Sequence, residues 1–129
     1  FYRRDTDMIQ LPRRECFASA GDYYATALHE LGHWSGHESR CNRQFGKRFG
    51  DDAYSFEELV AELSAAFLCA TCRIDGRLEH AVYIDNWLRI LRADRRAVLL
   101  AATQAQKATD YLLALSAKDD EAMALPLAA

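Results

Sequence analysis

The chain has 129 residues, of which 50% are hydrophobic and 27% are charged, and this composition excludes a largely disordered protein. Its formal net charge of −3 is too small to indicate a nucleic-acid or membrane partner, and no apolar run approaches the ~18 residues that a membrane helix needs. The charge is uneven, because residues 1–50 carry eight Lys and Arg against six Asp and Glu, whereas residues 51–129 carry eight against thirteen.

The predicted elements begin with a short edge strand over residues 7–11, where apolar side chains alternate weakly. A helix over roughly 22–35 follows, with Asp22 as its N-cap and Gly36 placed to end it. Residues 37–53 are polar, and a loop of this length is uncommon in a compact domain unless it has a function.

Three further helices are predicted after this loop. They run from about Ser55 to Cys72, over about 78–92, and over about 95–115 with Asp94 as the cap. The low content of Pro and Gly favours long helices of this kind. We therefore expect a mostly helical domain over residues 1–116 and a flexible tail over 117–129.

The first predicted helix contains the sequence His29-Glu30-Leu31-Gly32-His33, which is an HExxH motif. Because four residues of helix return nearly to the same face, His29 and His33 can present two imidazole nitrogens to one metal ion. Glu30 is placed to act as a general base on water at that metal. The motif predicts a zinc metallopeptidase site, and another divalent metal such as Mn²⁺ is compatible with it.

A catalytic zinc ion needs a third protein ligand. His37 lies two residues before the position that the metzincin pattern requires, so that pattern fails. Glu58 and Glu62 share one face of the next helix and resemble the acidic pair of gluzincins. We favour Glu58 as the ligand and Glu62 as the carboxylate that orients a ligand His, and the reversed assignment stays open. Tyr54, His37 and His80 are candidate donors to the oxyanion.

Basic side chains gather in the loop after the first helix, where two Phe residues alternate with them. This stretch is either a solvated loop or a contact for DNA or an acidic substrate. Glu57, in contrast to its neighbour Glu58, is expected to face solvent. The basic residues are Arg40, Arg43, Lys47 and Arg48.

The four Cys residues are too few and too irregularly spaced for a disulfide scaffold, which favours a reducing, cytoplasmic location. Cys69 and Cys72 form an isolated CxxC inside an apolar helix. Since a zinc knuckle needs a second pair, we interpret them as packing thiols.

Longer blocks extend the HExxH motif, among them YYATALHELGHWSGH and FGDDAYSFEELVAELSAAFLCA. Together they resemble the C-terminal metallopeptidase domain of ArdC-type antirestriction proteins, over about residues 5–115. The resemblance implies an α+β, zincin-like fold in which the HExxH helix lies against a small sheet and further helices follow. It also implies that His29, Glu30 and His33 form the motif and that the acidic ligand falls within residues 57–62.

The resemblance implies a function as well. ArdC-type proteins occur on plasmids and other mobile elements and protect incoming DNA from host restriction. They usually carry an N-terminal domain that binds single-stranded DNA, so we expect this chain to be the metallopeptidase part of a longer protein. The expected partners are a protein or peptide substrate, and single-stranded DNA mainly through that other domain, with no membrane partner.

Two alternative functions remain open at this stage. The first is a DNA-associated binding module that a metal stabilises and that has no proteolytic activity. The basic loop is the feature that suggests this function. The second is a regulatory protease similar to the ImmA/IrrE group, which also combines HExxH with a later acidic helix and acts on a repressor.

Overall fold

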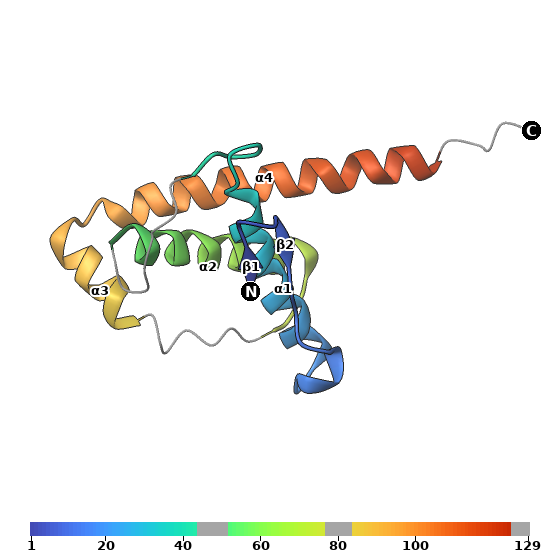
Figure 1. Ribbon diagram of the computed structural model, residues 1–129, viewed down its shortest axis with the longest axis horizontal. Helices are drawn as coiled ribbons and strands as arrows, with labels where there is room; N and C mark the ends of the chain where they lie inside the picture. Colours follow the sequence, from blue (N-terminus) through green and yellow to red (C-terminus); the bar gives the residue numbers. More distant parts are fainter. Residues whose placement is uncertain (44–51, 77–83, 125–129) are drawn as a thin grey trace, which may run out of the picture.

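A computed structural model describes residues 1–43, 52–76 and 84–124, and within these ranges the fold is mostly helical with one small sheet (Figure 1). The strands β1 (Tyr2–Arg3) and β2 (Met8–Ile9) pair antiparallel, with Tyr2 opposite Ile9. A single 3-10 turn, η1, leads into the helical part. The helices are α1 (Ala20–Ser35), α2 (Asp52–Cys72), α3 (Ile84–Ala93) and α4 (Ala97–Ala124), and η1 covers Arg14–Cys16. The α+β, mostly helical fold class predicted from the sequence is confirmed.

The strand predicted over residues 7–11 is present as the shorter β2. Its partner β1 was not predicted, because two residues are too few for a periodic signal. Asp7 turns the chain between the two strands with a φ of 51°, in the left-handed region that Asp and Asn tolerate better than other side chains. Both strands contact α1, so the hairpin covers one side of the HExxH helix (Figure 1).

The first helix begins earlier than predicted. Ser19, not Asp22, is the N-cap, because Ser19 is extended and its hydroxyl accepts a hydrogen bond from the Asp22 amide at 3.0 Å. Asp22 lies inside the first helical turn, where the helix dipole favours its charge. The end of the helix is as predicted, with Gly36 as the C-cap.

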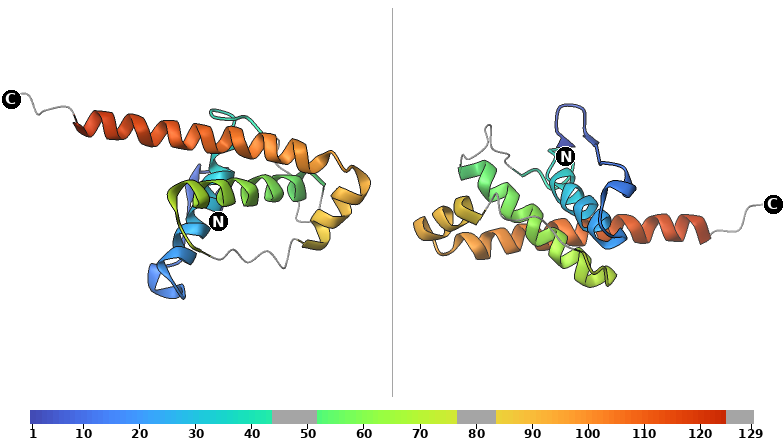
Figure 2. Two further views of the ribbon diagram at one scale, coloured as in Figure 1. Left: turned by 180° about the vertical axis from the view of Figure 1, so that it is seen from behind. Right: turned by 90° about the horizontal axis from the view of Figure 1, so that it is seen from below.

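Helix α2 is central and contacts α1, α3 and α4. Figure 2 shows it between α1 and the long α4. Its apolar side contributes Leu59 and Val60 to a core that Ala101 and Ala105 of α4 complete. The small alanine side chains let the two helices approach closely. Larger, partly buried side chains surround this core, namely Phe56, Leu63, Phe67 and Trp87.

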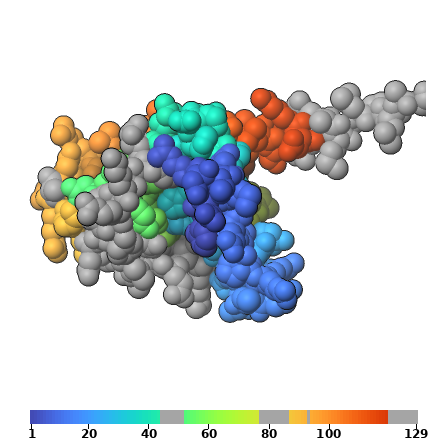
Figure 3. Space-filling view, in the orientation of Figure 1, coloured from blue at the N-terminus to red at the C-terminus, as the bar shows by residue number. Residues whose placement is uncertain are grey.

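Helix α4 continues to Ala124, so much of the expected tail after residue 116 is helical. Apolar periodicity ends near Leu115, but good helix formers follow this residue in the sequence. The C-terminal part of the helix projects away from the body (Figure 3). The apolar side chains of Leu88 and Val98 are 42% and 40% exposed. Among the described helices, none combines the length and apolarity that crossing a bilayer requires.

Candidate metal centre

The two helices that carry the predicted site cross at small residues. Gly32 of α1 lies against Ala61 of α2, and both are buried. Gly32 directly precedes His33, and Ala61 lies between Glu58 and Glu62. The crossing therefore places the HExxH motif opposite the acidic face of α2.

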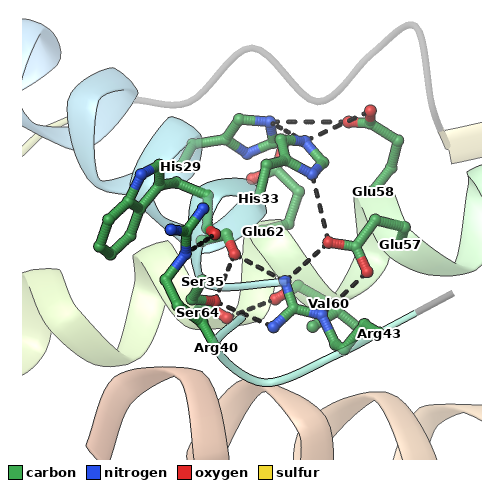
Figure 4. A network of polar contacts seen from close by, with 12 residues as sticks. His29, His33, Ser35, Arg40, Arg43, Glu57, Glu58, Val60, Glu62 and Ser64 are labelled. Carbon is green, nitrogen blue, oxygen red and sulfur yellow. Dashed lines mark hydrogen bonds and ion pairs between the residues drawn. The ribbon is translucent and has the colours of Figure 1, made fainter. Parts of the chain in front are cut away.

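Three predicted ligands converge at this crossing. His29 and His33 of α1 and Glu58 of α2 each offer a ligand atom, and these atoms lie within 4.8 Å of one another. The two Nε2 atoms are 3.2 Å apart. The Glu58 carboxylate oxygens lie 3.6 Å from Nε2 of His29 and 3.4 Å from Nε2 of His33 (Figure 4).

The donor set fits a divalent cation. Among the described buried atoms, Oε2 of Glu58 has no hydrogen-bond partner, although a buried, unsatisfied carboxylate oxygen is costly in free energy. Two imidazole nitrogens and one carboxylate are also the protein ligand set of one class of catalytic zinc site. A cation between these three groups would satisfy the buried oxygen and both Nε2 lone pairs.

Each histidine ring has a carboxylate near its Nδ1 atom, on the side away from the other ligands. Nδ1 of His29 lies 3.6 Å from Oε1 of Glu62, and Nδ1 of His33 lies 3.4 Å from Oε1 of Glu57. A carboxylate near Nδ1 favours the tautomer with the proton on that nitrogen, in which Nε2 carries the lone pair that a metal needs. Glu58 as the ligand and Glu62 as the orienting group stay a prediction, with Glu62 close to the His29 ring but not hydrogen-bonded to Nδ1.

The charges in the cluster depend strongly on one another. Burial alone would raise the pKa of Glu58, but the nearby rings of His29 and His33 lower this pKa to about 2. Burial alone would lower the pKa of His33, but Glu57 and Glu58 raise this pKa to about 9. The cluster of carboxylates between the helices therefore favours positive charge.

Glu57, expected to face solvent, is buried and belongs to the site. Its carboxylate accepts hydrogen bonds from Nε of Arg43 at 2.9 Å and from Nη2 of Arg43 at 2.7 Å. Sequence reasoning missed this pair. We find no signal for it in the sequence, because the burial of a charged pair depends on how two segments meet in space.

Arg40 and Arg43, two of the four basic residues considered as contacts for DNA or an acidic substrate, do not present free guanidinium groups on the surface. The Arg43 side chain is 5% exposed and donates to protein groups. The Arg40 side chain is 8% exposed, lies 3.7 Å above the Trp34 ring, and pairs with Asp7. Both guanidinium groups are thus occupied inside the protein. Lys47 and Arg48, the other two predicted contacts, lie outside the described residues.

The remaining candidates are spread around the centre. The Glu30 carboxylate lies 3.4 Å from the amino group of Phe1 and is mostly buried. Tyr54 is half-buried in the first turn of α2, and its role stays a prediction. His37 does not join the ligand group of the described residues, and its Nδ1 lies 2.8 Å from the Ser39 hydroxyl. His80 lies outside the described residues.

The CxxC thiols lie at the end of α2, away from the crossing. Both thiols are free, with Cys69 half-buried and Cys72 exposed. Burial raises the pKa of Cys69. The packing role predicted for the pair therefore suits Cys69, whereas the exposed Cys72 does not fit it.

Comparison with known proteins defines the class of the fold. A family model described as zincin-like metallopeptidase (MPTase-PolyVal) matches residues 1–104. The chain belongs to this family, as its HExxH helix and acidic second helix indicate.

Two solved structures are similar to the chain. The Mn(II)-bound crystal structure of the antirestriction protein ArdC from plasmid R388 superposes with a TM-score of 0.78 at 42% identity, covering 88% of this chain and 43% of that one. The metal-free form of ArdC gives a TM-score of 0.80 at 41% identity and covers 92% of this chain. The resemblance to ArdC-type proteins is thereby confirmed.

The domain also occurs in proteins with other names. The protein y4eC of Sinorhizobium fredii (strain NBRC 101917 / NGR234) is 44% identical over 114 residues, which are 87% of this chain and 37% of that protein. The DNA primase TraC of Escherichia coli is 44% identical over 119 residues, which are 92% of this chain and 11% of TraC. The chain thus spans well under half the length of these relatives.

Proposed function

We propose that this domain is the divalent-metal-dependent peptidase part of an ArdC-like antirestriction protein. The observation that carries the proposal is the convergence of His29, His33 and Glu58 within 4.8 Å, with carboxylates behind both rings. Two histidines and a glutamate favour Zn²⁺, and the Mn(II)-bound form of the related ArdC supports Mn²⁺ as the alternative.

The chemistry follows from the roles of the side chains. A divalent metal held by His29, His33 and Glu58 would supply Lewis acidity, which lowers the pKa of water to ~7 and polarises a carbonyl. Glu30 accepts the proton of the attacking water and returns it to the leaving amine. Tyr54 is the proposed hydrogen-bond donor to the developing oxyanion.

The partners are also part of the proposal. The proposed substrate is a polypeptide, because an HExxH motif with a bound divalent metal suits the hydrolysis of an amide. Single-stranded DNA is bound by another part of the full-length protein, since Arg40 and Arg43 are occupied by protein groups. The similarity to an antirestriction protein of plasmid R388 supports a role in antirestriction.

The test combines metal content with hydrolysis. The purified domain is dialysed against Zn²⁺ or Mn²⁺, its metal is measured by mass spectrometry, and cleavage of labelled casein and of a mixed-sequence peptide library is followed. We expect one metal ion per chain. Glu30→Gln should keep the metal and lose at least about 10²-fold in rate, whereas His29→Ala should lose both.

Two results would contradict the proposal. One is a wild-type protein that binds neither metal at micromolar concentration. The other is a Glu30→Gln variant that cleaves as fast as the wild type.

A further inference from the structure

We propose that Arg43 is a positioning residue of the metal centre, which holds Glu57 in place behind His33 and thereby sets the affinity for the metal. The inference rests on the proposed metal site. Arg43 is not itself a ligand, since it acts through a carboxylate that contacts the ring of His33. Four observations support it.

The first is that one carboxylate oxygen is shared. Oε1 of Glu57 lies 2.7 Å from Nη2 of Arg43 and 3.4 Å from Nδ1 of His33 (Figure 4). The other oxygen, Oε2, accepts from Nε of Arg43 at 2.9 Å. This two-point contact fixes both the position and the plane of the carboxylate. The carboxylate can then hold the His33 ring at one rotation and in one tautomer.

The second is that Arg43 is anchored to the same helical turn as His33. Its Nη2 donates to the Gly32 carbonyl at 2.6 Å, and its Nη1 donates to the Ser35 hydroxyl at 2.9 Å. At the end of α1 the amide of Gly36 bonds to the carbonyl of His33. The Gly32 carbonyl, near the end of the helix, receives the guanidinium instead.

The third is burial. The side chains of Arg43 and Glu57 are 5% and 4% exposed. A buried charge that loses its partner is strongly unfavourable, so the two-point contact with Arg43 holds the Glu57 carboxylate in its position.

The fourth is the charge of the cluster. The carboxylates of Glu57, Glu58 and Glu62 all lie within 3.6 Å of a histidine nitrogen. The guanidinium of Arg43 neutralises one of these three charges, and two remain. Two negative charges match a divalent cation, because both imidazoles would bind it in their neutral form.

The experiment measures metal affinity, not hydrolysis. Zn²⁺ and Mn²⁺ are titrated into metal-free protein against a chelating dye. We expect Arg43→Gln and Glu57→Gln each to raise the metal Kd by about 10–100-fold, the usual effect of removing a group that orients a ligand. Because Arg43 acts through Glu57, the double variant should bind no more weakly than Glu57→Gln.

Arg40→Gln is the matched control. Arg40 lies in the same loop and donates to the Trp34 carbonyl of the same helix at 2.7 Å. Its guanidinium pairs with Asp7, which is outside the metal cluster. If arginines merely held the loop to α1, Arg40→Gln and Arg43→Gln would lower Tm alike and leave the metal Kd at the wild-type value. That result would overturn the inference.

A second variant covers the case in which Arg43→Gln does not fold. Arg43→Lys keeps the charge but loses the two-point contact. We expect it to raise the Kd and to change the visible absorption spectrum of bound Co²⁺, which reports ligand geometry. A wild-type Kd and spectrum in Arg43→Lys, or additive effects in the double variant, would overturn the inference.

The outcomes separate this inference from the proposed function. Normal metal binding without hydrolysis would reject the peptidase and leave the role of Arg43 to be decided by the Kd values. Conversely, if Arg43→Gln binds metal with the wild-type Kd and still cleaves peptides, only the role of Arg43 is rejected and the proposed function stands.

Discussion

Gly32 of α1 and Ala61 of α2 are in such close contact that a methyl group on Gly32 would lie 3.1 Å from Cα of Ala61 and 3.2 Å from its carbonyl oxygen. Both of these atoms belong to the backbone of α2, which cannot move away as a flexible side chain can. The glycine in the HExxH motif therefore sets the distance between the two histidines and Glu58.

Gly32→Ala is expected to destabilise the domain, although alanine favours helix formation. The gain in helix propensity is about 1 kcal/mol, whereas overpacking costs about 1–3 kcal/mol. We expect a lower Tm, unchanged helical content by circular dichroism, and a higher metal Kd, because Glu58 moves away from the histidines. A Gly32→Ala protein with higher Tm and unchanged Kd would contradict the crossing geometry.

The ligand assignment makes a graded prediction for three substitutions. Glu58→Gln removes a ligand and should abolish metal binding in the micromolar range. Glu62→Gln removes the group near His29 and should raise the metal Kd by about 10–100-fold. His37→Ala should leave the Kd unchanged, because His37 lies outside the ligand group. An anomalous-scattering map at the zinc edge provides the direct check, and a metal on Glu62 in place of Glu58 would reverse the roles.

Metal removal should lower the stability of the folded state. A ligand at 100 times its Kd contributes about 2.7 kcal/mol to stability, so adding Zn²⁺ to chelator-treated protein should raise Tm by several degrees. Glu30→Gln, which keeps all three ligands, should show the same rise, and His33→Ala should show none. An equal Tm with and without metal in the wild type would exclude the cluster as a metal site.

The hairpin should detach from α1 in acid. The hydrogen bond from Arg40, followed by that from Tyr2, lowers the pKa of Asp7 to about 2 from its ordinary 3.8. The contribution of ionised Asp7 is therefore fully present above pH 3.8 and is lost as the pH falls through about 2. Asp7→Asn keeps a residue that tolerates the positive φ. Its Tm should lie below that of the wild type at neutral pH, and the difference should disappear in acid.

Asp5→Asn is the control for this prediction. Asp5 pairs with Arg3 at 3.3 Å on the exposed surface of the hairpin, and exposed ion pairs contribute little to stability. Its Tm should follow that of the wild type over the whole pH range. If the Tm of Asp7→Asn follows the same pH dependence as the Tm of Asp5→Asn, the contact between Asp7 and Arg40 does not hold the hairpin.

Local patterns in the sequence predicted the parts of this structure that depend on neighbours along the chain. The spacing of His29 and His33 and the spacing of Glu58 and Glu62 each follow from one helical turn, and the structure brings these four residues together. The predicted ends of the helices were less accurate. Ser19 and Asp22 are both good caps, and the choice between them depends on backbone conformation.

The parts that were missed depend on contacts between segments. Arg40 and Arg43 looked like a basic loop, but one stacks on Trp34 and the other is enclosed with Glu57. Glu57 and Glu58 are adjacent and chemically identical in the sequence. Only their positions relative to α1 and the loop after it distinguish them. Glu57 contacts the His33 ring, whereas Glu58 can bind a metal.

The candidate metal centre takes its ligands and the groups behind them from α1, the turn after it and α2, which form one stretch of chain from His29 to Glu62. Ligands that are close in sequence lose little loop-closure entropy when a metal joins them. All groups of the centre therefore stay together wherever the domain is inserted, in a short host or a long one. The relatives fit this view, since the matched region makes up 37% of y4eC and 11% of TraC.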